Sequence, residues 1–133
     1  MADIAVTPSL VKPLPGARTE RFMAGGSGSV GDTVYVDSAG KVQVADASVA
    51  GAAHAIGVAA SAPGGKTTFV LNDSLDVVMD GKITGFSGMT PGDILYQSDT
   101  AAKLGDAAGT VSHKMGKPLS ATVLWLRPGD EEA

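Results

Sequence analysis

The sequence predicts an all-β protein: a small antiparallel β-sandwich or barrel, jelly-roll-like, with an internal repeat and an extended N-terminal arm. Composition is the first observation behind this prediction, because 18 glycines, 7 prolines and only 5% aromatic residues in 133 are typical of many short strands joined by tight turns. The second is a series of about nine or ten short apolar runs separated by polar turns. The third is that one pattern occurs twice.

The repeat covers residues from about 29–60 and 90–118. Each copy begins with Gly-Asp, continues through a short strand that contains a tyrosine, a polar turn and a strand led by lysine, and is followed by an apolar-Gly step. These steps are Ile56-Gly57 and Met115-Gly116. Because the repeated residues are turn formers and core apolar residues, the duplicated unit is predicted to be scaffold.

Residues 1–17 are predicted to form the arm. Pro8, Pro13 and Pro15 lack a backbone N–H and fix φ, which disfavours a helix and favours extended structure. We expect residues 2–14 of the arm to be unstructured in the free protein, with a β domain over 18–127 and an acidic tail over 128–133.

The β domain is expected to begin with a strand over Arg18–Met23, followed by a glycine-serine loop. Strands over 33–36 and 41–44 flank Asp37-Ser38-Ala39-Gly40, a polar turn with glycine where positive φ is needed, which predicts a hairpin. Residues 45–53 are rich in alanine; one or two helical turns, or a loop with a partial turn, both fit them.

Downstream, a strand is expected over 54–60. A second hairpin is expected from 67–71 and 75–79, joined by Asn72-Asp73-Ser74 and closed by Asp80-Gly81. The remaining β-branched and apolar runs predict strands over 83–86, 94–97, 103–105, 113–117 and 121–126.

Charge and cysteine content exclude several classes of function. Fourteen acidic and ten basic residues give a net charge of −4 without any run of Lys or Arg, so nucleic acid is not an expected partner. Disulfides and thiolate metal sites are excluded because there is no cysteine. No apolar run approaches membrane-spanning length and the N-terminus does not resemble a signal peptide, so we expect a soluble protein made in the cytoplasm.

Three patterns resemble functional motifs, and a structural role explains each better. Gly64-Gly65-Lys66-Thr67 resembles the end of a phosphate-binding loop, but a β-branched strand follows where that loop needs a helix. His54 and His113 occupy matched places in the two copies, as duplication alone would produce, and the series Asp73, Asp76 and Asp80 fits no calcium loop. None of the serines lies in a Gly-x-Ser-x-Gly nucleophile elbow. Taken together, these patterns predict no catalytic, cofactor or metal site.

The order of these motifs nevertheless resembles a known family. Gly-Asp-x-Val/Leu-Tyr, an Ile-Gly-Val-Ala step, a Thr-Pro-Gly-Asp-Ile-Leu-Tyr return and the closing Met-Gly-Lys-Pro-Leu-Ser-Ala-Thr-Val-Leu look like the capsid decoration (cement) proteins of tailed bacteriophages. The resemblance covers Ser29 to about Leu126 and is most specific over Gly116 to Leu124; the pair Lys117-Pro118 departs from the usual ending.

The resemblance implies a virion protein without enzymatic activity that binds the outer surface of the capsid. Its partner would be the phage major capsid protein, whose neighbouring subunits it would brace as a homo-oligomer, either dimer or trimer, after synthesis in the bacterial host cytoplasm. We expect the arm to bind the capsid by adding a strand to an exposed sheet edge. The candidate contact residues are Ile4, Val6, Pro8, Leu10, Val11 and Leu14.

Two other classes of function remain open. One is a host-receptor-binding or glycan-binding module of a phage fibre or head fibre, which should expose aromatic residues in a groove. Trp125, Tyr35 and Tyr96 are the candidates, although core positions on strands are expected for all three. The other is a hydrolase on a β scaffold, which would need a convergent pair of polar residues with shifted ionisation.

Overall fold

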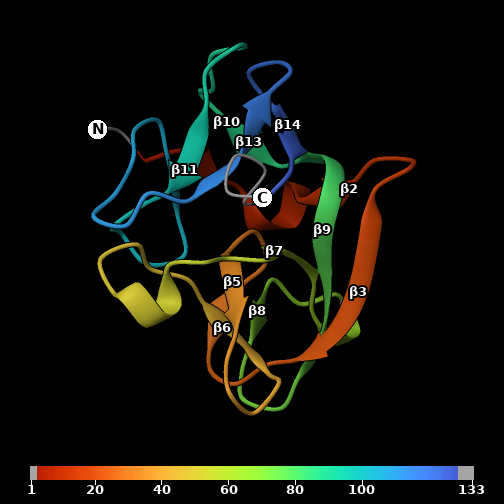
Figure 1. Ribbon diagram of the computed structural model, residues 1–133. Coiled ribbons are helices and arrows are strands. Elements are labelled where there is room, and N and C mark those ends of the chain that lie inside the picture. Colours follow the sequence, from red (N-terminus) through yellow and green to blue (C-terminus); the bar gives the residue numbers. More distant parts are fainter. Residues whose placement is uncertain (1–2, 129–133) are drawn as a thin grey trace.

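The computed structural model describes residues 3–128 and confirms the all-β fold class. The strand ladders are antiparallel, and the main sheet curls into a half-barrel (Figure 1). In chain order the strands are β1 (Ala5–Val6), β2 (Lys12–Pro13), β3 (Arg18–Met23), β4 (Gly28–Ser29), β5 (Thr33–Val36), β6 (Val42–Val44), β7 (Gly57–Ser61), β8 (Thr68–Phe69), β9 (Ser74–Thr84), β10 (Phe86–Ser87), β11 (Leu95–Gln97), β12 (Leu104–Gly105), β13 (Lys114–Pro118) and β14 (Val123–Leu126). Three short 3-10 turns accompany them: η1 (Pro8–Leu10), η2 (Ala50–Ala52) and η3 (Pro63–Gly65).

β9 is the longest strand and joins the two halves of the main sheet. Its first half pairs with β3 on one edge and β7 on the other, and its second half pairs with β2 and β14. The strand order along the sheet is β12-β11-β13-β14-β9-β7-β5-β6. In Figure 1 the first copy of the repeat, coloured orange to yellow, therefore lies toward one end of β9 and the second copy, coloured cyan to blue, toward the other.

The two copies of the repeat have the same strand pairing. In each copy a hairpin is followed by a third strand that pairs with the first strand of the hairpin: β5 with β6 and β7, and β11 with β12 and β13. Residues at matching positions also face each other in two places, although β11 and β13 have a register shift after Leu95 that β5 and β7 lack. The corresponding pairs are Val36–Val42 and Gln97–Leu104, then Val34–Gly57 and Leu95–Gly116.

The glycine of each apolar-Gly step lies against the backbone of a neighbouring strand. A Cβ atom on Gly57 would lie against the carbonyl oxygen of Val78 on β9, well inside 3.0 Å. One on Gly116 would lie equally close to the carbonyl oxygen of Trp125 on β14. Since real Cβ atoms do not approach so closely, a side chain would force the third strand of each copy away from its neighbour.

Backbone hydrogen bonds join the two copies directly. The Thr33 N–H donates to the Ala102 carbonyl over 3.1 Å, and the Ala102 N–H donates to the Ala45 carbonyl over 2.7 Å. Ala47 donates to the Ser98 carbonyl over 3.0 Å. The two copies therefore share one hydrophobic core, because buried side chains of both belong to a single cluster. The largest fully buried members of this cluster include Val34, Phe69, Leu75, Ile83, Leu95, Leu104, Met115, Leu124 and Leu126.

Several predicted elements agree with the structure. The hairpin around Asp37-Ser38-Ala39-Gly40 is confirmed, with Gly40 at φ +81°. The alanine-rich stretch contains only the partial turn η2.

Two predictions about the middle of the chain are wrong. β8 does not form a hairpin with β9 but pairs with β4, because the turn over residues 70–73 redirects the chain away from β8. Asp80-Gly81 does not end a strand either: residues 74–84 form one strand, because both of its halves have pairing partners on both edges.

Candidate functional site

The N-terminal segment, residues 3–17, lies on the body of the protein. Its backbone pairs at three places: β1 with β10, β2 with β9, and the Ile4 N–H with the Leu104 carbonyl over 2.8 Å. The expectation that this segment is unstructured in the free protein is therefore wrong. The physical reason is that it supplies core residues: Ile4 is 7% exposed and Val11 is 9% exposed.

Glycines on the body make room for this segment. A Cβ atom on Gly85, whose φ is +106°, would lie 2.6 Å from Cα of Val11. One on Gly31, at φ +97°, would lie 2.6 Å from Cγ2 of Val6. The body and the segment are thus closely complementary in shape.

The six candidate capsid-contact residues fall into three groups. Ile4 and Val11 are core residues, and Val6, Pro8 and Leu14 are half-buried. Leu10 alone is a large exposed side chain, at 62% of its surface. β1 and β2 each pair with one strand of the body, β10 and β9, along one edge.

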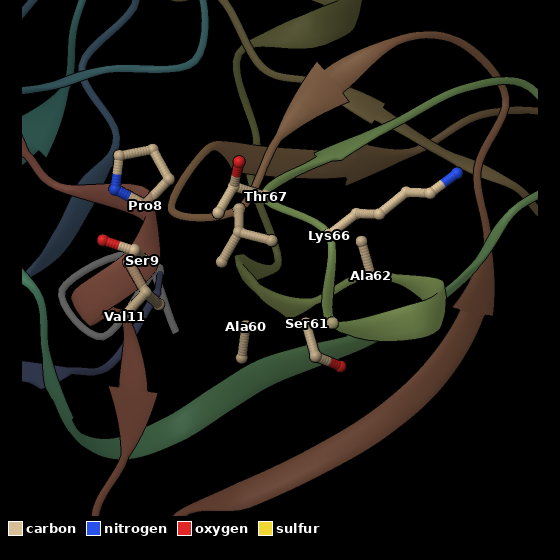
Figure 2. Close-up of a pocket in the computed structure, with 10 residues that line it drawn as sticks. Pro8, Ser9, Val11, Ala60, Ser61, Ala62, Lys66 and Thr67 are labelled. Atoms are coloured by element: carbon tan, nitrogen blue, oxygen red, sulfur yellow. The ribbon is translucent and has the colours of Figure 1, made fainter.

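A hollow of about 160 Å³ lies where the N-terminal segment meets the loop before β8 (Figure 2). Pro8, Ser9 and Val11 form one side and Thr67 the other, above Ala60 and Ser61. The Ser61 hydroxyl donates to Asp76 over 3.0 Å. Figure 2 shows the Lys66 side chain extending away from Pro8 and Ser9, and the hollow has no aromatic lining.

The motif-like residues have structural contacts. Gly64-Gly65-Lys66-Thr67 contributes the turn η3 and then leads into β8. Asp73 accepts the Val70 N–H over 2.9 Å, and Asp76 forms an ion pair with Arg21 at 3.2 Å. Among residues 3–128, no three His, Asp or Glu side chains group as a metal site would require.

The matched histidines of the two copies meet. Their ring centroids lie 5.0 Å apart with the planes at 83°. His113 is buried, and its Nε2 lies 2.8 Å from the carbonyl oxygen of Ala55; His54 is exposed. The contact joins equivalent positions of the repeat.

Two carboxyl groups near the first hairpin have shifted ionisation. Burial raises the pKa of Asp32, against the opposing effects of the Ser29 N–H, which donates to it over 2.7 Å, and of the charge of Lys103. The pKa of Asp37 is lowered, chiefly because the Gln43 amide donates to it over 2.7 Å. Both aspartates hold local turns through these backbone and side-chain bonds.

One exposed apolar surface lies at the start of β9, and we call it the turn surface: Met23, Val70 and Leu71, which are 45%, 58% and 56% exposed. The turn is held by the Asp73 N–H bond to the Val70 carbonyl over 3.1 Å and the Asn72 N–H bond to the Ala24 carbonyl over 2.8 Å. Grouped apolar side chains on an ordered turn are typical of a contact with another molecule.

A second exposed apolar surface lies over the other half of β9, and we call it the sheet surface: Leu119 and Trp125, 46% and 40% exposed. Trp125 lies opposite Lys82 of β9. The sequence predicted a core position for this tryptophan, and its exposure differs from that prediction. The guanidinium carbon of Arg127 lies 5.2 Å from the centre of the Trp125 ring.

Sequence reasoning missed both surfaces. Val70 and Leu71 end the apolar run 67–71, which predicted a strand. The turn residues that follow this run directly were the only local indication that the two side chains lie on a turn. The exposure of Trp125 depends on pairing between β14 and β9, which are far apart in the sequence.

Comparisons with known proteins add no relative. No protein-family model matches the sequence, and no curated protein is significantly similar to it. Within residues 3–128, the structure contains no helix with the length and apolar character needed to cross a membrane.

Proposed function

We propose that this protein is a structural virion protein that binds the outer surface of a phage capsid and braces neighbouring major capsid subunits. The resemblance of residues 29–126 to capsid decoration proteins supports the proposal. The observation that carries it is the presence of two exposed apolar surfaces near the two ends of β9. A brace needs two separate contacts on one rigid body.

The separation of the two surfaces suits this role. The turn surface adjoins Ser74, and the sheet surface is centred on Trp125, whose partner on β9 is Lys82. At ~3.3 Å per residue, the eight steps between Ser74 and Lys82 span roughly 26 Å. Because each half of β9 includes residues that are paired on both edges, the sheet holds the two surfaces apart.

Binding at many equivalent sites strengthens a shell even where each contact is modest. A ligand that binds only the assembled state stabilises it by RT ln(1 + [L]/Kd), or about 2.7 kcal/mol when its concentration is 100 times Kd. A homo-oligomer, dimer or trimer, would add avidity because its copies bind together. No catalytic step is part of this proposal.

Co-sedimentation tests the proposal. Purified protein is mixed with expanded empty shells of the phage whose genome carries the coding sequence, and pelleted shells are assayed for bound protein. We expect saturable binding at a fixed ratio to the major capsid protein. Leu71→Asp, which places a charge on the turn surface, should reduce binding, whereas Val49→Asp, at another exposed apolar position, should not. Absence of wild-type binding would overturn the proposal.

The exposure of Trp125 favours one second candidate, a glycan-binding module of a fibre. Such modules hold sugars on aromatic side chains in a groove. The hollow of Figure 2 contains no aromatic residue, and Trp125 lies outside it. A glycan array separates the candidates: selective binding that Trp125→Ala abolishes would favour the glycan module.

A further inference from the structure

We propose that the outward face of the sheet β2-β9-β14-β13 is a docking surface for a protein surface with clustered carboxylates. The inference deepens the proposed function and rests on it only for the identity of the partner, an acidic region of a capsid subunit. We call this surface the basic sheet face: Lys12, Lys82, Lys117, Leu119, Trp125 and Arg127.

Trp125 lies between two lysines. It pairs with Lys117 on β13 and with Lys82 on β9. Directly opposed residues of antiparallel strands project from the same face, with Cβ atoms about 5 Å apart. Both lysines are exposed, so an aromatic side chain is flanked by two ammonium groups.

The next row across the same strands extends this face. Val123 pairs with Thr84 on β9, and Thr84 pairs with Lys12 on β2. Leu119 lies opposite Val123, since its N–H donates to the Val123 carbonyl over 2.8 Å. The opposite face of β14 carries Leu124 and Leu126, which are fully buried. The basic sheet face therefore combines an apolar centre with cations around it.

This face concentrates positive charge on an acidic protein. Four of the ten Lys and Arg residues belong to it, and the other six are accompanied by eleven acidic residues among residues 3–128. Among residues 3–128, no carboxylate forms an ion pair within 4.0 Å of Lys12, Lys82 or Lys117. Because the four cations come from four separate places in the sequence, they form no basic run.

A carboxylate-bearing protein surface fits this face better than nucleic acid does. Tryptophan and arginine are the side chains most enriched at the centres of protein interfaces, and Leu119 adds apolar contact area. The Arg127 guanidinium lies over the Trp125 ring, so the face presents a cation beside its aromatic centre. A long polyanion would extend past the four cations onto a surface where acidic residues outnumber basic ones, and these would repel it. A local cluster of carboxylates stays beside the four cations, and its repulsion by acidic residues more than about 8–10 Å away is screened by salt.

Trp125 is the single tryptophan of the chain, so its fluorescence reports on this face without a label. The full-length protein is titrated at low salt with blocked hexaglutamate, and separately with hexathymidylate. We expect a saturable change in emission with hexaglutamate that weakens as salt is added. Lys82→Glu and Lys117→Glu should each weaken binding by about fivefold or more.

Lys66→Glu is the matched control, because Lys66 is exposed in the loop before β8 and the substitution changes net charge equally. It should leave the affinity for hexaglutamate within about twofold of wild type. Equal losses in all three variants, or no response to hexaglutamate at millimolar concentration, would overturn the proposal. Tighter binding of hexathymidylate than of hexaglutamate would also overturn it and assign the face to nucleic acid.

Binding of the same variants to expanded shells distinguishes failure of this proposal from failure of the proposed function. If wild-type protein binds expanded shells and Lys82→Glu and Lys117→Glu bind equally well, the docking of carboxylates on this face is wrong and the proposed function stands. If hexaglutamate binds at Trp125 but shells do not bind, the face is a docking surface and the capsid function is wrong.

Discussion

At the scale of single residues, two glycines set the geometry of the duplicated framework. Gly57 and Gly116 stand at the same position of the two copies, and each lies against a carbonyl oxygen of the adjacent strand. Both copies therefore require a residue without a side chain at this position. The apolar-Gly step occurs in both copies of the sequence because this packing requires the glycine.

Gly57→Ala tests this requirement. We expect a loss of about 3 kcal/mol or more in the free energy of unfolding, because the new Cβ would displace β7 from β9. Urea denaturation measures the change. Gly51→Ala is the control, since nothing lies within 4 Å of its added Cβ, and it should stay within about 0.5 kcal/mol of wild type. A loss for Gly57→Ala as small as that of the control would show that the close approach is not required.

Asp32→Asn tests the electrostatics of the first copy. A raised pKa means that the folded protein holds the proton more tightly than the unfolded chain does, so ionisation of Asp32 costs stability. That cost is absent below the unfolded pKa of ~3.9 and is complete above the folded pKa. An asparagine side chain does not ionise and still accepts the Ser29 N–H.

The stability of the wild-type protein relative to the Asp32→Asn variant should therefore fall as pH rises from about 4. Urea denaturation of both proteins over a series of pH values measures this difference. A constant difference, or one that changes with the opposite sign, would contradict the assigned cause.

The sequence predicted residues that act locally and missed those that act through distant pairing. Gly40 was expected at positive φ from its place in a polar turn, and it adopts φ +81°. Gln97 was expected only as part of a strand, yet it is fully buried and its amide donates to the Ala45 carbonyl over 3.1 Å. That environment arises from contact between the two copies, which no local pattern encodes.

At the scale of elements, the N-terminal segment is part of the fold. Its prolines do favour extended structure, as the sequence indicated, and η1 begins at Pro8. Composition alone suggested an arm, but Ile4 and Val11 have core positions that only the folded body provides. The same limit applies to β8: its β propensity was readable, whereas its partner β4 was not.

Ile4→Ala tests the role of this segment. We expect a loss of about 2–4 kcal/mol in the free energy of unfolding, since the substitution removes a buried side chain from the core. Leu10→Ala, on the same segment, should change stability by less than about 0.5 kcal/mol because Leu10 is exposed. Thermal unfolding followed by circular dichroism compares the two. Equal, small effects would mean that the segment does not contribute to the core.

At the scale of the whole molecule, one long strand connects two copies of a scaffold and two exposed surfaces. The fold class and the repeat were predictable because turn chemistry and self-similarity are local signals. The surfaces were not, because both form where chain segments distant in sequence meet around β9. The proposed brace relies on this arrangement, in which the two surfaces lie roughly 26 Å apart along β9.

The thermal stability of decorated shells tests this account most directly. Calorimetry compares expanded empty shells alone, with saturating wild-type protein, and with the same concentration of the Leu71→Asp or Leu119→Asp variant, which change the turn surface and the sheet surface. A brace predicts that wild-type protein raises the melting temperature of the shell and that loss of either surface removes most of the increase. Shells that melt at the same temperature with and without bound wild-type protein would contradict it.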